Sequence, residues 1–91
     1  MLDQDRIDQI VKDAAAATLG SGVVQSVRSS PMVDFEGAEA LRIQITLTEG
    51  STNEVRSTAL KALSEIHDRL QREGEERFPI IEYDEARRGA S

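Results

Sequence analysis

The sequence contains no cysteine and few aromatic residues, and both absences limit what the protein can do. Without cysteine the chain forms no disulfide, has no thiolate nucleophile and lacks the usual ligands of structural zinc. Its aromatic rings are Phe35, Phe78 and Tyr83, which are too few for a platform on which nucleic-acid bases stack. We therefore expect an aliphatic core and no catalytic, cofactor or metal site.

Positive charge is also scarce, since the chain has a net charge of −6 that is spread along its whole length. Nucleic-acid binding depends on Lys and Arg neutralising phosphates, so this balance disfavours it. The N-terminus is acidic where a signal peptide would be basic, and no apolar run approaches the roughly 18 residues of a membrane span. We predict a cytoplasmic protein without a membrane partner.

The length and composition indicate one folded domain. The chain has 91 residues, of which 38% are hydrophobic and 31% charged, an ordinary balance for a globular protein. A chain of this size is too short to build two separate cores. We predict a single α/β domain over residues 1–84 and a flexible C-terminal tail over residues 85–91.

Two segments have the apolar spacing of amphipathic helices. The first covers residues 3–19, with Asp3 as the expected N-cap. The second is expected to begin with a capping box formed by Ser51 and Glu54 and to end at Gly74. Its apolar stripe consists of Val55, Ala59, Ala62, Leu63, Ile66 and Leu70.

Alternating apolar and polar residues predict the strands. The clearest strand covers residues 40–48, and a weaker one covers residues 23–30. Pro31 must end this weaker strand, bend it, or lie on a sheet edge, because it cannot donate a ladder hydrogen bond. The turn-like link over residues 32–39 predicts an antiparallel hairpin, and residues 78–84 predict a short third strand.

The element order α-β-β-α-β predicts an α+β fold that is a two-layer sandwich. We expect a three-stranded mixed sheet with both helices on one face and the other face open to water. The crossover through the second helix should make the third strand parallel to one of the hairpin strands.

The open face of the hairpin is the one surface that differs from the acidic remainder. It is expected to carry two arginines and no carboxylate. One interpretation is an ordinary solvated sheet surface, and the other is a docking face for a partner or an anionic ligand, because arginine forms bidentate bonds with carboxylate and phosphate. The candidate partner-binding residues are Ser26, Arg28, Ser30, Arg42, Gln44, Thr46 and Thr48.

Other residue groups with chemical potential have ordinary structural explanations. His67, the single histidine, is expected at the boundary of the second helix without a catalytic partner. The glycines at positions 20 and 22 end a helix and do not begin one, so they form no phosphate loop. Two acidic groups lack the spacing of a calcium loop and are predicted to be solvated: Glu82, Asp84 and Glu85; and Asp34, Glu36 and Glu39.

Two resemblances bear on function. Residues 74–81, with the sequence GEERFPII, resemble a segment of short bacterial proteins expected beside HEPN-type proteins, which implies an accessory or antitoxin-like role. The element order is similar to that of BolA-like and type II KH-like domains. The chain has neither the GxxG loop nor the Arg-His-Arg run of those families, so this second resemblance concerns topology alone.

These observations favour a non-enzymatic module that binds another protein, or a second copy of itself, through the sheet face or a strand edge. The alternatives are a nucleic-acid-binding domain of KH-like or BolA-like topology and, last, a small enzyme with a site between subunits. No cofactor is expected for the favoured module.

Overall fold

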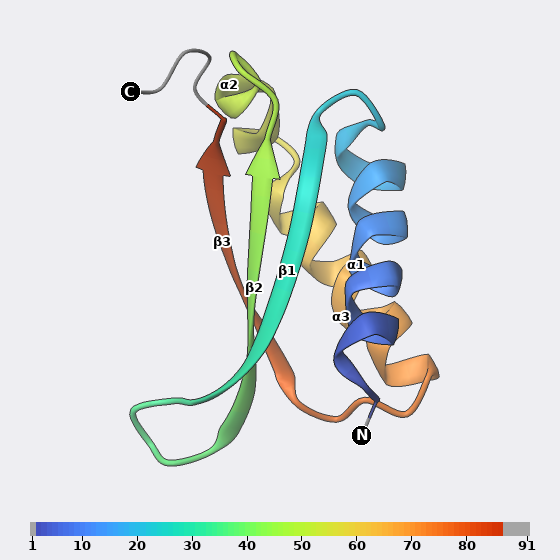
Figure 1. Cartoon of the computed structure of the whole chain (residues 1–91), viewed down its shortest axis with the longest axis vertical. Helices are drawn as coiled ribbons and strands as arrows, with labels where there is room; N and C mark the ends of the chain where they lie inside the picture. The colour runs from blue at the N-terminus through green and yellow to red at the C-terminus, as the bar shows by residue number, and fades with distance from the viewer. Residues whose placement is uncertain (1, 87–91) are drawn as a thin grey trace.

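The computed structural model describes residues 2–86 and shows an α+β fold, as the sequence predicts. The chain begins with a helix, continues through a hairpin and a broken helix, and ends with a strand (Figure 1). The elements are α1 (Gln4–Leu19), β1 (Val24–Val33), β2 (Glu39–Leu47), α2 (Thr52–Arg56), α3 (Ala59–Arg72) and β3 (Phe78–Glu85).

The three strands form one mixed sheet in the order β1-β2-β3. β1 is antiparallel to β2, and β3 is parallel to β2, so the crossover prediction is confirmed. β2 therefore lies in the centre, and β1 and β3 are the two edge strands. This arrangement decides which side chains share the exposed face.

The core lies between the sheet and the helices α1 and α3, which are on the same side of the sheet (Figure 1). Leu41, Ile43, Ile45 and Leu47 of β2 are each at most 1% exposed and pack in one cluster with both helices. The alternating side chains of β2 point away from this cluster. The hydrophobic alternation of the sequence thus sets the two faces of the sheet.

The start of α1 follows the sequence prediction. The Asp3 carboxylate accepts a 2.9 Å hydrogen bond from the backbone amide of Arg6, which caps the helix. Gly20 follows the last helical residue with φ of 110°, a value that side-chain-bearing residues rarely adopt. The helix therefore ends where the sequence indicates.

The second helix is not continuous, and the expected capping box is wrong. Ser51 makes no side-chain cap, because its hydroxyl lies 2.7 Å from the hydroxyl of Thr48. The helix breaks between α2 and α3, where the Thr58 hydroxyl bonds to the carbonyls of Glu54 and Val55. Such side-chain bonds compete with the helical backbone and explain why one apolar stripe became two helices.

The first strand of the hairpin is longer than predicted, and the link to the second strand is shorter. β1 continues through Pro31 to Val33, because β1 is an edge strand and needs no donor there. The Asp34 carboxylate accepts 2.9 Å bonds from the amides of Glu36 and Ala38 and holds the turn closed. The turn therefore begins at Asp34, two residues later than predicted.

The third strand extends to Glu85, one residue beyond its predicted end. Positions 87–91 of the predicted tail lie outside the described residues. The domain boundary at residue 84 stays a prediction.

The free edge of β1 is closed by side chains of α1. The backbone amide of Ser29 donates a 2.8 Å hydrogen bond to the Asp8 carboxylate, and the Ser29 hydroxyl donates to the same oxygen. The Ser29 carbonyl accepts from the side-chain amide of Gln4. Pro31, two positions along the same edge, has no backbone N–H to donate. An incoming strand would find these positions of β1 already satisfied.

We expect Asp8→Ala to lower the free energy of unfolding by about 1–3 kcal/mol, because it leaves a buried amide and hydroxyl without an acceptor. Ser29 is 1% exposed, so water cannot replace the carboxylate without rearrangement. Urea denaturation measures the change, and amide exchange at Ser29 should become faster. Asp5→Ala, which removes an exposed carboxylate of the same helix, is the control. Equal stability of the two variants would contradict the edge-closing role.

Candidate functional site

The outward side chains of the three strands form rows across the sheet, which we call the outer face. Residues paired across strands point to the same side, so the register gives each row directly. The rows, from the α2 end to the hairpin end, are Ser26, Thr46 and Asp84; Arg28, Gln44 and Glu82; and Ser30, Arg42 and Ile80. In the last row Met32 pairs with Ala40 and Ala40 with Phe78, but the Phe78 ring is turned to α3, where it lies 5.0 Å from that of His67.

The structure brings six of the seven predicted face residues together on the outer face. The seventh, Thr48, follows the end of β2, and its hydroxyl donates a 2.9 Å hydrogen bond to the carbonyl of Gly22. Thr48 therefore serves the loop between α1 and β1. The six others are exposed or half-buried: Ser26, Arg28, Ser30, Arg42, Gln44 and Thr46.

The expectation of a face without carboxylates is wrong for the complete sheet. β3 adds Glu82 and Asp84 beside β2. Arg42 donates from Nε and Nη2 to the Glu82 carboxylate at 3.1 and 3.0 Å. Both side chains remain almost half exposed, so this ion pair contributes little to stability. The hairpin pattern could not reveal it, because the partner comes from a distant part of the sequence.

Arg28 is the unpaired cation of the outer face. Within residues 2–86 its side chain makes no hydrogen bond or ion pair. It is exposed and lies opposite Gln44, a neutral residue. Its guanidinium can thus form a bidentate bond with a carboxylate without losing an existing partner.

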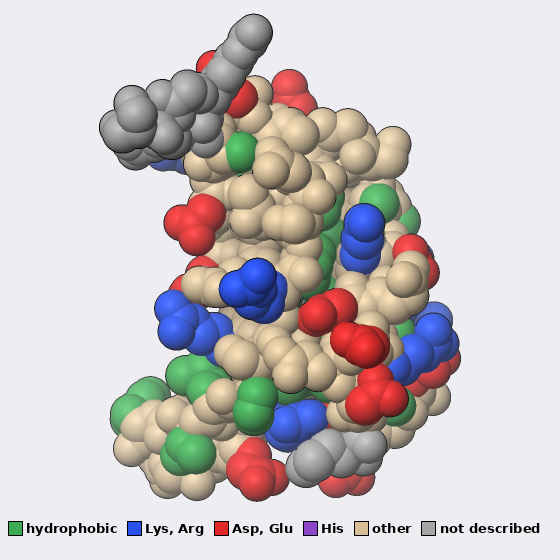
Figure 2. All heavy atoms as spheres, viewed as in Figure 1, with side chains coloured by type: hydrophobic (Ala, Val, Ile, Leu, Met, Phe, Trp, Pro, Cys, Tyr) green, Lys and Arg blue, Asp and Glu red, His purple; other side chains and the backbone are tan. Residues whose placement is uncertain are grey.

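Large apolar side chains are exposed at the hairpin end of the sheet. Val33 is 63% exposed, Phe35 97% and Phe78 52%, and Met32 lies in the same row as Phe78. We call these four residues the hairpin patch; it covers both sides of this end of the sheet, because Val33 and Met32 are neighbours on β1 and point to opposite sides. Figure 2 shows hydrophobic side chains gathered at the lower left, over the hairpin, with basic side chains above them. An exposed apolar group beside polar residues is typical of an interaction surface.

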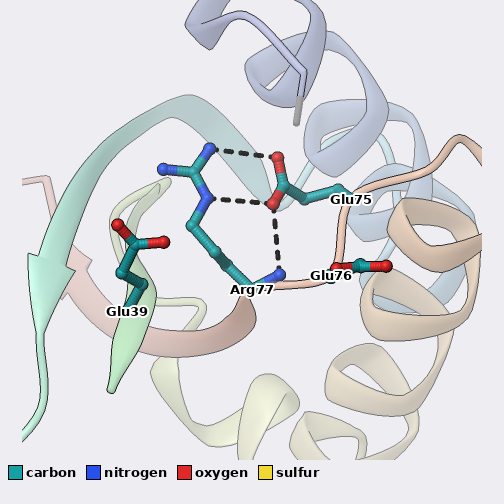
Figure 3. A pocket seen from close by; sticks show the side chains of 4 residues that line it. All are labelled: Glu39, Glu75, Glu76 and Arg77. Carbon is teal, nitrogen blue, oxygen red and sulfur yellow. Dashed lines mark hydrogen bonds and ion pairs between the residues drawn. The ribbon is translucent and has the colours of Figure 1, made fainter. Parts of the chain in front are cut away.

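A second polar group lies below the sheet, in the loop between α3 and β3 (Figure 3). The Glu75 carboxylate accepts bonds from Arg77 Nε at 2.9 Å, from Arg77 Nη2 at 3.0 Å and from the backbone amide of Arg77 at 3.1 Å. It also accepts a 3.0 Å bond from the amide of Leu2. The Glu75–Arg77 pair thus ties the start of the chain to the loop that leads into β3.

Burial makes this pair unusual among the ion pairs of the described residues. The side chain of Glu75 is 1% exposed and that of Arg77 12%. The hydrogen bonds from Arg77 outweigh the cost of burial and lower the pKa of Glu75 from 4.5 to about 2. The same hydrogen bond raises the pKa of Arg77. Both groups are therefore charged at neutral pH.

The hollow beside this pair has a volume of about 230 Å³ and is lined by Glu39, Glu75, Glu76 and Arg77. The Arg77 guanidinium directs two nitrogens to Glu75, and Glu76 points away from it (Figure 3). Because three glutamates line the hollow and its single arginine is already bonded to Glu75, the hollow is poorly suited to an anion. We assign the pair a structural role. Sequence reasoning missed it, since Glu75 and Arg77 resemble any solvated charge run.

The remaining candidates occupy structural positions. His67 is half-buried, as predicted for a boundary residue, and its ring centre lies 5.0 Å from that of Phe78. Glu85 accepts bonds from the amide and hydroxyl of Thr52 at the start of α2, at 3.2 and 2.6 Å. Within the described part of the chain, no cluster of His, Asp and Glu is arranged to hold a metal ion.

Comparison of the chain with protein-family models, curated protein sequences and solved structures gives no match. The resemblances drawn from residues 74–81 and from the element order therefore stay predictions. None of the helices within residues 2–86 is long and apolar enough to cross a membrane.

Proposed function

We propose that the chain is a non-enzymatic module that binds another protein through the outer face and the hairpin patch. The observation that carries this proposal is the unpaired Arg28 on a sheet whose hairpin end exposes large apolar groups. Arginine and aromatic residues are the side chains that most often dominate binding energy at protein interfaces.

The chemistry of the surface favours a protein partner over a nucleic acid. A nucleic acid requires several cations along one surface, and the outer face has Arg28 unpaired while Arg42 is held by Glu82. A partner with an acidic side chain beside apolar ones matches both Arg28 and the hairpin patch. Burying Phe35, which is 97% exposed, would supply much of the hydrophobic stabilisation.

Arg28→Glu combined with Phe35→Ser tests the proposal. Both residues are exposed, so the fold should be unaffected, while binding should weaken at least about tenfold as expected for interface hot spots. The measurement is quantitative capture of proteins from a native lysate on immobilised wild type and variant, followed by titration of each captured protein in purified form.

Lys12→Glu is the matched control, because it makes the same charge change on an exposed position of α1. A partner that the control retains and the double variant loses supports the proposal. If the wild type, the double variant and Lys12→Glu all capture the same proteins, the proposal is contradicted. Binding of a mixed-sequence oligonucleotide at low salt, lost in the double variant, would favour nucleic-acid recognition.

A further inference from the structure

The edge of β3 differs from the edge of β1. The amide of Ala86 donates to the carbonyl of Leu47 at 2.8 Å. Because hydrogen bonds alternate along a parallel ladder, the even-numbered residues of β3 turn their amides and carbonyls toward β2. Ile81 and Tyr83 then direct theirs to the free edge. No described residue bonds to the backbone of either on that side.

The outer side of this edge is acidic. Asp84 is exposed and makes no ion pair within residues 2–86, and Glu82, 45% exposed, is bonded to Arg42. The two carboxylates are two residues apart on one strand, so they point to the same side. A strand added to β3 would place basic side chains at alternate positions opposite them.

The inner side of the same edge is apolar. His67 of α3 contacts Phe78 of β3, which shows which flank of α3 faces this edge. Leu60 and Leu63 lie on the same helical stripe as His67, at three- and four-residue spacing. Leu60 is 82% exposed and Leu63 half-buried. The other flank of α3 carries Glu65 and the residues beside α1. An added strand could therefore bury apolar side chains against this stripe.

We propose that the β3 edge binds an extended segment of a partner protein in which basic and apolar residues alternate. The basic side chains would lie beside Glu82 and Asp84, and the apolar ones over Leu60 and Leu63. The backbone would pair with Ile81 and Tyr83 and extend the sheet. This inference rests on the proposed function and adds the chemistry of the partner.

Charge disfavours two of the registers in which a second copy of the chain could pair with β3. In a two-fold antiparallel pairing of β3 centred on Glu82, the two Glu82 carboxylates lie opposite each other. A pairing centred on Tyr83 places Glu82 opposite Asp84 of the second copy. Like charges in these positions destabilise the pairing, whereas a basic segment removes the repulsion.

A nine-residue peptide with lysine at alternate positions and valine between them tests the proposal. Its termini are acetylated and amidated. Binding should protect the amides of Ile81 and Tyr83 from hydrogen exchange by at least about tenfold, while the amide of Glu82, already in the ladder, should change little. A version with glutamate in place of lysine, and one with proline in place of alternate valines, should not bind.

Asp84→Lys should weaken lysine-peptide binding about three- to tenfold and allow the glutamate peptide to bind. Asp13→Lys, the same charge change on α1, is the control and should leave the affinity within about twofold at 0.15 M salt. Leu60→Glu should also weaken binding, and its high exposure leaves the core untouched.

Peptide binding without protection of Ile81 and Tyr83 would overturn the edge assignment, and so would failure to bind at millimolar concentration. Light scattering that shows a dimer, with both amides already protected in the free protein, would make the second copy the occupant. If binding of a partner protein is weakened by substitution of Arg28 but not by substitution of Asp84 or Leu60, the proposed function holds and only this inference is rejected.

Discussion

Glu75→Ala is expected to lower the free energy of unfolding by about 3 kcal/mol, because it leaves the Arg77 guanidinium without its partner in a largely buried position. The variant also removes the acceptor for the Leu2 amide, so the start of α1 loses its tie to the loop before β3. Urea denaturation at neutral pH measures the change. For a domain of this size the expected loss is a large fraction of the total stability.

The same pair predicts a pH dependence. The pKa of Glu75 is lowered from 4.5 to about 2, so its contribution to stability is complete above pH 4.5 and is lost as the pH falls toward 2. The shift corresponds to roughly 3 kcal/mol at neutral pH. Urea denaturation at pH 7 and pH 3 should show a smaller acid-induced loss in Glu75→Gln than in the wild type.

Glu76→Ala is the matched control for both measurements, since Glu76 is exposed, adjacent in sequence and directed away from Arg77 (Figure 3). Its effect should stay within about 0.5 kcal/mol. If Glu75→Ala and Glu76→Ala are equally stable, the Glu75–Arg77 pair has no structural role.

Ile43→Ala should cost about 3 to 4 kcal/mol of unfolding free energy, because it opens a cavity in the centre of the sheet. Ile43 is fully buried in the core and lies between Ser29 of β1 and Ile81 of β3. Thermal or urea denaturation measures the loss. Because β2 supports both neighbouring strands, the variant tests the element that positions the outer face.

Gln44→Ala, at the next position of the same strand, should change stability by less than about 0.5 kcal/mol. Gln44 points to the outer face, where it lies between Arg28 and Glu82. If Ile43→Ala and Gln44→Ala lower the free energy of unfolding by similar amounts, one face of β2 is not buried and the other exposed as the structure shows.

The fold was predictable to the extent that it depends on local periodicity. The alternation of β2 identified its buried and exposed faces, and the Asp3 cap and Gly20 fixed α1. The predictions failed where a side chain can form hydrogen bonds with more than one partner. The Ser51 hydroxyl lies against that of Thr48 and caps no helix. Pro31 was compatible with three outcomes, and its place on an edge strand decided among them.

The candidate face was predictable only in part, for the same reason. The phase of the hairpin strands follows from their own sequence, so Arg28 and Arg42 were placed correctly on the exposed side. Whether an arginine is paired depends on the neighbouring strand. Glu82 is 40 residues from Arg42 and reaches it because β3 returns parallel to β2.

By itself the sequence determined the α+β class, the element order and the faces of the central strand, because these depend on side-chain spacing along a single element. The tertiary structure alone decided that Glu75 and Arg77 are buried and that α1 closes the β1 edge. It also left the backbone of Ile81 and Tyr83 without partners among the described residues. Burial and pairing of this kind depend on which distant segments meet, and local patterns carry no information about that.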